Sequence, residues 1–68
     1  MDIVIKEEWI CQRMAVLGVN KEQISGVLHI STSSFVNKIR NKTDFTLPEA
    51  LMLCKMLKVN INDLYEVN

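Results

Sequence analysis

Residues 21–42, KEQISGVLHISTSSFVNKIRNK, combine cationic and hydrogen-bonding side chains more densely than the rest of this 68-residue chain. Within residues 31–43 every charged residue is basic, and these residues are Lys38, Arg40 and Lys42. Short hydroxyl and amide side chains lie between them, and such groups both donate and accept hydrogen bonds. A surface of this kind suits contact with phosphate groups and with polar edges rather than the breaking of covalent bonds.

Groups typical of catalysis or of metal binding are few. The chain has one histidine, His29, and two cysteines, Cys11 and Cys54, which do not form a CxxC pattern. It has no glycine-rich loop and no nucleophile with a base at a recognisable spacing, so we expect no enzyme, no metal and no cofactor. Both cysteines fall inside apolar helical patterns, and we expect two buried thiols in a reducing cytoplasm. The alternative is a redox switch between them.

Length and charge restrict the fold and the location. A chain of 68 residues, of which 49% are hydrophobic, predicts a single domain over residues 1–68. The net charge is zero, which is unusual for a non-specific nucleic-acid binder but compatible with phosphate contact at one basic segment. No apolar run approaches the ~20 residues that span a bilayer. The start, MDIVIKEEW, lacks a signal peptide's features, so we expect a cytoplasmic protein with no membrane segment.

Apolar periodicity predicts the first helix, at residues 5–17. Ile10, Met14 and Leu17 recur at i, i+4 and i+7, which places them on one helical face. Gly18 follows directly and is suited to end the helix, because glycine adopts the left-handed backbone without steric cost.

Capping residues predict where the next helices begin. Asn20 and Thr46 can each cap a helix, because Gln23 and Glu49 stand three residues later as capping-box partners. Ser31 can cap the helix between these two, which we expect at residues 32–40.

The remaining signals complete the expected architecture. Phe35 and Ile39 are four residues apart and are expected to face the core together. His29 stands at a sharp turn, where its tolerance of positive φ is useful. Asn60 is placed to cap a last short helix at residues 61–66. No segment alternates with a period of two, so we assign no strand and expect an all-α fold of five helices.

Two stretches, KEQISGVLHISTSSFVNKIRNK and DFTLPEALMLCKMLKVNINDLY, together resemble the Cro/repressor-type (XRE) helix-turn-helix proteins of phages and bacteria. The resemblance covers residues 6–65 and implies a compact five-helix bundle, the lambda-repressor-like DNA-binding domain. It also implies that the third helix enters the major groove of operator DNA and that the protein is a homodimer on a two-fold site. Two positions depart from the family pattern: His29 replaces a glycine, and Ser25 replaces an alanine.

By position, the resemblance assigns base reading to Thr32, Ser33 and Asn37, with Lys38 as a further candidate. Asparagine suits adenine and lysine suits guanine, while hydroxyl groups serve several bases. The phosphate contacts implied at the second helix and after the third come from Lys21, Arg40, Asn41 and Lys42. The start of the third helix behind Ser31 adds backbone donors for phosphate. We expect about three to five phosphates to be neutralised per subunit.

Met52 and Met56 lie one turn apart in the fourth helix. They could fill gaps in the core, or they could form a dimer or partner surface, and the sequence leaves both interpretations open. Trp9, by contrast, is expected to pack in the core.

The leading hypothesis is a small transcriptional regulator, like a Cro or a compact repressor, that occupies operator DNA. The alternative is a protein-interaction module on the same fold, such as an antirepressor or an antitoxin-like partner binder. The neutral net charge and the Met52/Met56 surface favour this alternative.

Overall fold

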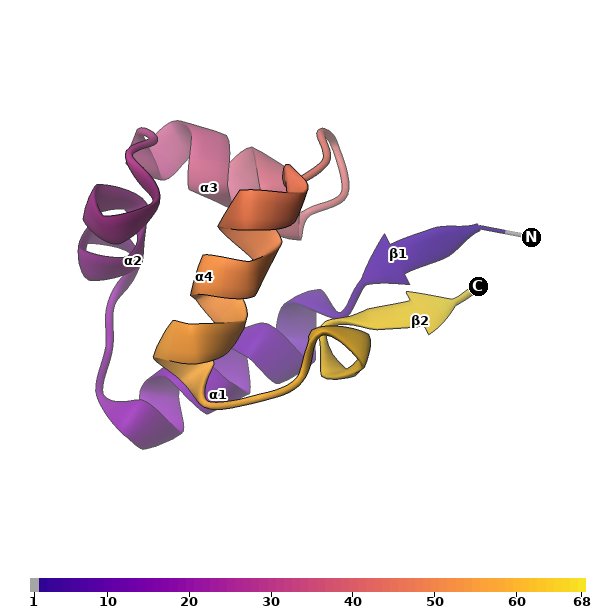
Figure 1. Cartoon of the computed structure of the whole chain (residues 1–68), viewed down its shortest axis with the longest axis horizontal. Helices are drawn as coiled ribbons and strands as arrows, with labels where there is room; N and C mark the ends of the chain where they lie inside the picture. The colour runs from indigo at the N-terminus through magenta and orange to yellow at the C-terminus, as the bar shows by residue number, and fades with distance from the viewer. Residues whose placement is uncertain (1) are drawn as a thin grey trace.

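The computed structural model describes residues 2–68 as four α-helices and a short 3-10 helix beside a two-stranded sheet (Figure 1). Helix α4 lies at the centre, in front of α1 and α3, and α2 closes one side. The two strands project together on the opposite side and bring Asp2 within hydrogen-bond distance of Asn68. In chain order the elements are β1 (Ile3–Ile5), α1 (Glu7–Leu17), α2 (Lys21–Leu28), α3 (Thr32–Ile39), α4 (Leu47–Leu57), η1 (Ile61–Asp63) and β2 (Tyr65–Val67).

The predicted helix starts at α2, α3 and α4 are confirmed. The Asn20 side chain accepts a hydrogen bond from the backbone N–H of Gln23 at 2.8 Å, and the Gln23 side chain accepts one in return at 2.9 Å. Thr46 and Glu49 form the same reciprocal pair at the start of α4. The Ser31 hydroxyl accepts from the N–H of Ser34 at 3.0 Å. These bonds satisfy backbone donors that have no partner inside the helix.

The helix ends use the left-handed backbone. Gly18 ends α1 with φ +71°, as its position predicts. His29 ends α2 with φ +60°, which confirms the sharp turn expected there. Lys58 and Asn41 also have positive φ, of 60° and 64°. Lysine is less suited to this conformation than asparagine, whose short polar side chain can bond locally.

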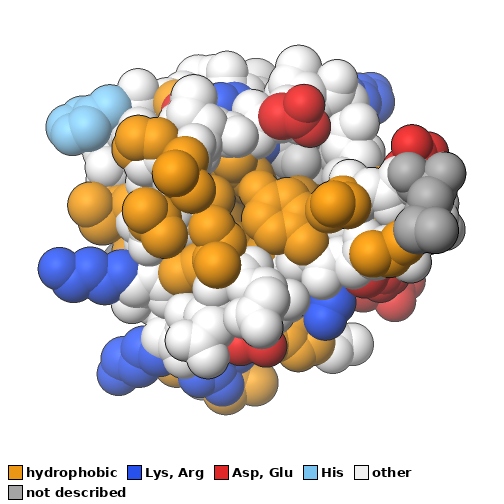
Figure 2. Space-filling view, turned by 45° about the vertical axis from the view of Figure 1, so that its right-hand side comes forward, with side chains coloured by type: hydrophobic (Ala, Val, Ile, Leu, Met, Phe, Trp, Pro, Cys, Tyr) orange, Lys and Arg blue, Asp and Glu red, His pale blue; other side chains and the backbone are white. Residues whose placement is uncertain are grey.

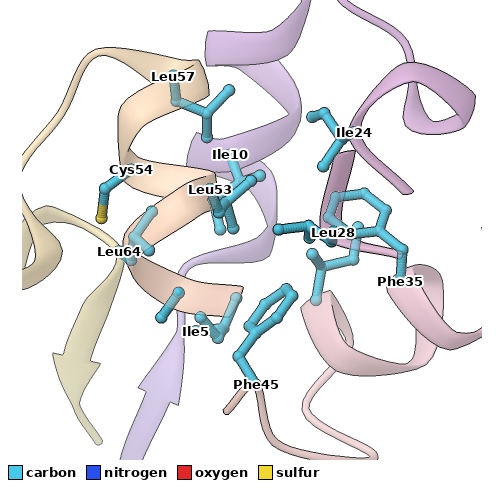
Figure 3. Close-up of a cluster of buried hydrophobic side chains, with 12 residues drawn as sticks. Ile5, Ile10, Ile24, Leu28, Phe35, Phe45, Leu53, Cys54, Leu57 and Leu64 are labelled. Atoms are coloured by element: carbon cyan, nitrogen blue, oxygen red, sulfur yellow. The ribbon is translucent and has the colours of Figure 1, made fainter. Parts of the chain in front are cut away.

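The core unites all four α-helices, the loop before α4 and the C-terminal segment (Figure 3). Phe35 and Ile39 of α3 are buried, as expected, and the ring centroids of Phe35 and Phe45 lie 6.1 Å apart. Trp9 packs against this core, as predicted, and is half-buried. The fully enclosed side chains are Phe35, Ile10, Ile24, Leu53, Leu57 and Leu64.

The expectation of an all-α bundle of five helices is wrong. The predicted last helix, 61–66, is only a single 3-10 turn, Ile61–Asp63, followed by strand β2. The predicted first helix starts at Glu7 rather than at residue 5, because Ile3–Ile5 forms strand β1. Both strands contain β-branched or aromatic residues, which favour extended backbone. Each strand has three residues, which is too short for a period-two pattern to be recognised in sequence.

The antiparallel strands pair Ile5 with Tyr65 and Ile3 with Val67. Residues paired across two strands share a face, so these four side chains lie on the same side of the ribbon. Ile5 is buried in the core, whereas Ile3 and Val67 are exposed at the free end. An isolated two-stranded ribbon is marginally stable, so this one requires an anchor on the bundle.

Asn41 supplies that anchor. Its side-chain oxygen accepts a hydrogen bond from the N–H of Ile5 at 2.7 Å, and its amide nitrogen donates to the Ile5 carbonyl at 3.1 Å. The amide therefore occupies the place of a third strand at the open edge of β1. It joins the terminal ribbon to the residue that follows the end of α3 by two positions.

We expect Asn41→Gly to lower the free energy of unfolding by about 1–2 kcal/mol, because it removes two hydrogen bonds and leaves Ile5 unpaired. Glycine keeps the left-handed backbone, so the change isolates the amide. Urea denaturation measures the stability, and hydrogen exchange should show the Ile5 amide losing more protection than the core amides.

Lys58→Gly is the matched control, since Lys58 also has φ +60° and lies at the exposed end of α4. This change should be neutral or slightly stabilising. Unchanged Ile5 protection in Asn41→Gly would contradict the anchoring role.

Candidate nucleic-acid interface

The relative placement of α2 and α3 depends on a short turn and on a small buried residue. Ser25 is 3% exposed, and its hydroxyl donates to the Lys21 carbonyl at 2.6 Å within α2. The Ser25 carbonyl in turn accepts from the N–H of Ile30 at 3.1 Å, in the turn that leads to α3. A serine here satisfies its own hydroxyl within the helix, so it occupies an interior position without an unpaired polar group.

An open groove of about 230 Å³ lies between the start of α2 and the outer side of α3. It is lined by Lys21 together with Thr32, Ser33, Val36 and Asn37. Four of the predicted site residues are thus brought together, with a cation on α2 facing hydroxyl and amide groups on α3. The exposed groups of Lys21, Ser33 and Asn37 are available to a ligand in this groove.

Val36 lines the same groove and was missed as a site residue, because its apolar side chain was assigned to the core side of α3. It is half-buried, with part of its surface open to the groove. The missing signal is spacing: Val36 follows Thr32 by four residues and Ser33 by three, so the three side chains must share a helical face. The groove therefore has one apolar contact among its polar ones.

Lys38 is held on the other side of α3. Its ammonium nitrogen lies 2.6 Å from a Glu49 carboxylate oxygen, and the two side chains are only 14% and 15% exposed. The same nitrogen is 5.8 Å from the centre of the Phe45 ring. The ammonium therefore lies against the start of α4 and does not line the groove with Asn37, the other residue expected to read bases.

The Lys38–Glu49 pair also affects ionisation. The hydrogen bond from Lys38 and the backbone N–H of Thr46 hold the pKa of Glu49 below its ordinary value of 4.5. The charged carboxylate is thus stabilised in the fold, and the contact joins the end of α3 to the start of α4.

The residues after α3 divide between two roles. Both polar atoms of the Asn41 side chain, which was expected to contact phosphate, bond the backbone of Ile5 inside the fold. The Nε atom of Arg40 lies 3.6 Å from a carboxylate oxygen of Glu7, and both side chains are more than 40% exposed. This ion pair is therefore weak, and Arg40 can leave Glu7 for another anion. Lys42 is exposed, and its N–H donates to the Asn37 carbonyl at 2.9 Å.

Ser31 and the α4 methionines also have defined places. The Ser31 hydroxyl is engaged in the cap of α3, which leaves the first backbone N–H groups of that helix facing outward. Met56 is half-buried and packs against the core, whereas Met52 is 40% exposed. Met56 therefore fills part of the core, and Met52 is the more exposed of the two methionines. Cys54 is buried as expected, but Cys11 is exposed, so the prediction of two buried thiols is wrong for Cys11.

Comparison with other proteins does not identify the chain: it matches no model of a known protein family and no curated protein. Within residues 2–68, no group of three or more His, Cys, Asp or Glu side chains is placed to hold a metal ion. None of the helices in this part of the chain has the length and apolar character that crossing a bilayer requires.

We expect Glu49→Gln to lower the free energy of unfolding at pH 7 by about 1 kcal/mol, because Lys38 loses a charged partner while glutamine keeps the capping box. The pKa of Glu49 is lowered in the fold, so its contribution is full above pH 4.5 and is lost as the pH falls through the lowered value. The wild type and Glu49→Gln should therefore have similar free energies of unfolding in strong acid. Urea denaturation of both proteins at neutral and strongly acidic pH measures the difference between them.

The control for Glu49 is Glu66→Gln, because Glu66 is exposed on the ribbon. This variant should follow the wild type at neutral pH. A stability gap in Glu49→Gln that persists unchanged in acid would contradict the ion-pair explanation.

Proposed function

We propose that this protein is a sequence-specific DNA-binding transcriptional regulator, like a Cro or a compact repressor, as its resemblance to the Cro/repressor-type family implies. Helix α3 enters the major groove and α2 lies across the backbone. The observation that carries the proposal is the groove in which Lys21 faces Thr32, Ser33 and Asn37. A cation on α2 beside short hydrogen-bond donors and acceptors on one face of α3 is an arrangement suited to reading the major groove.

Each groove residue has a role in this proposal. The Asn37 amide bonds adenine, and Ser33 and Thr32 bond base edges or phosphate. The methyl groups of Val36 and Thr32 pack against thymine methyl groups. Lys21 fixes the protein on the phosphate backbone without reading sequence.

Among the residues expected at phosphate, Asn41 has partners inside the fold, and Arg40 is partly paired with Glu7. Lys21, Lys42 and Arg40, with the start of α3 behind Ser31, carry the contacts to the DNA backbone. We therefore expect about two or three phosphates to be neutralised per subunit, with a shallow salt dependence. A single subunit would bind weakly, so the protein acts as a homodimer on a two-fold operator, where two linked half-sites multiply affinity. The cytoplasm of a bacterium, or of a phage-infected host, is the compartment in which it would act.

A specific observation supports the second function, a protein-interaction module of the antirepressor or antitoxin-like kind. Leu47 and Leu51 of α4 are 64% and 51% exposed, on a protein with zero net charge. Exposed apolar patches often mark binding surfaces. This function predicts tight binding to a protein and no salt-sensitive binding to DNA.

Selection of bound sequences from a random duplex pool, at ~100 mM salt, tests the main proposal. We expect a two-fold symmetric motif with half-sites about one helical turn apart. Recovery of no sequence above background would contradict DNA binding and favour the protein-interaction alternative.

Substitutions in the groove should distinguish residues that read bases from residues that contact the phosphate backbone. Asn37→Ala should reduce discrimination at one base pair per half-site by roughly 5–150-fold, because the amide contact is lost. Lys21→Gln should weaken binding to all sequences similarly and reduce the salt slope by about one per subunit. Titrations of matched and mismatched duplexes at several salt concentrations measure both effects.

Lys58→Asn is the charge-matched control, since it removes one cation from the end of α4 and asparagine tolerates the left-handed backbone. Its affinity for a half-site duplex, which one subunit binds alone, should equal that of the wild type. If Lys58→Asn weakens binding as much as Lys21→Gln, the groove is not the binding site.

A further inference from the structure

Helix α4 carries an exposed face that the DNA-binding proposal does not use. The N-terminal half of this face is entirely apolar, and Leu47, Leu51 and Met52 keep 64%, 51% and 40% of their surface exposed. Its C-terminal half is basic. We define the α4 outer face as the exposed residues of α4 and its cap: Leu47, Pro48, Leu51, Met52, Lys55 and Lys58.

An acidic residue stands beyond the apolar end of this face. Asp44 is exposed in the loop before α4. Figure 2 shows hydrophobic side chains gathered across the middle of this side of the molecule, with Lys and Arg at its left and lower left and acidic side chains above and to its right. From the loop before α4 to the C-terminal cap of this helix, the exposed side chains are therefore first acidic, then apolar and then basic.

The geometry points to a second copy of this chain as the occupant of the α4 outer face, with the two α4 helices packed antiparallel about a two-fold axis. A two-fold interface requires a surface that complements itself. An antiparallel register that sets Leu47 against the second copy's Met52 also sets Pro48 against Leu51. With a rise of 1.5 Å per residue, the same register sets Lys55 about 4.5 Å beyond the second copy's Leu47 along the axis, on the side of the exposed loop that carries Asp44. Apolar residues meet apolar residues, and opposite charges meet at both ends.

The extent of the surface sets the strength of this dimer. A standard interface buries about 800 Å² per partner, and the whole protein exposes 4535 Å². The apolar half of one eleven-residue helix, with the adjoining ribbon, is smaller than a standard interface. We therefore expect a dissociation constant of roughly 10–100 μM without DNA.

The dimer leaves the DNA-binding groove free. The groove is lined by residues of α2 and α3 and by none of α4, and helix α4 lies in front of α3 in Figure 1. This inference deepens the homodimer part of the proposed function and rests on it for its biological meaning. The dimer is nevertheless measured without DNA, so the two proposals can fail separately.

Sedimentation equilibrium of the purified chain, over roughly 1–500 μM, is the first test. We expect a reversible monomer–dimer equilibrium, which Leu51→Glu should weaken by roughly 20-fold or more, because it places a charge in the apolar contact. The matched control is Val16→Glu, since Val16 is 75% exposed on α1. Circular dichroism checks that both variants fold. A wild-type protein that stays monomeric, or a control that weakens the dimer equally, would overturn the proposal.

A charge exchange tests the register. Asp44→Lys and Lys55→Glu should each weaken the dimer by roughly 5–30-fold, because each creates two like-charge contacts across the axis. The double variant should return to within roughly threefold of the wild type. Failure of this restoration would overturn the antiparallel arrangement. Leu51→Glu should still bind a half-site duplex as a monomer, so loss of DNA binding in all variants would count against the proposed function and not against the dimer.

Discussion

Burial of the Phe35 ring is the constraint on which the rest of the molecule depends. The side chain has no exposed surface and lies among residues of α2, α4 and the loop that carries Phe45 (Figure 3). Removing such a ring costs proteins about 3–5 kcal/mol, a large share of the stability of a 68-residue domain. Helix α3 has only eight residues, so the side that buries Phe35 and Ile39 decides which side remains for Thr32, Ser33 and Asn37. Core packing and the candidate binding groove are thus two consequences of one helix orientation.

The end of α3 is secured by polar contacts with other parts of the fold. Lys38 pairs with Glu49 of α4, and Asn41 bonds both backbone groups of Ile5. These contacts attach the helix to α4 on one side and to the terminal ribbon on the other. Helix α3 is therefore held at both of its ends: by the Ser31 cap and turn at the start, and by side-chain bonds at the finish. Such preorganisation reduces the ordering cost of binding.

The parts of the fold that sequence predicted are those determined by residues close together in the chain. The boxes at Asn20 and Thr46 act over three residues, so the starts of α2 and α4 were predicted correctly. The ribbon was missed because it joins residues at opposite ends of the chain, and its three-residue strands carry no usable periodicity. The same limit applies to side chains. The partner of Lys38 is eleven residues away, and the partner of Asn41 is thirty-six residues away. Neither could be inferred from the basic segment alone.

Ion pairs within the fold link the candidate binding groove to the α4 outer face, because they reduce the positive charge that is available to DNA. Lys38 is neutralised by Glu49, and Arg40 is partly balanced by Glu7, so the third helix and its loop are less basic in space than in sequence. Reduced phosphate attraction lowers the affinity of one subunit for any duplex, specific or not. Affinity for a particular site must then come from base contacts and from linking two subunits, and both of these favour a two-fold operator over random DNA. The proposed dimer through the α4 outer face, weak by itself, suits this arrangement, because DNA with two half-sites would assemble it at protein concentrations below its own dissociation constant.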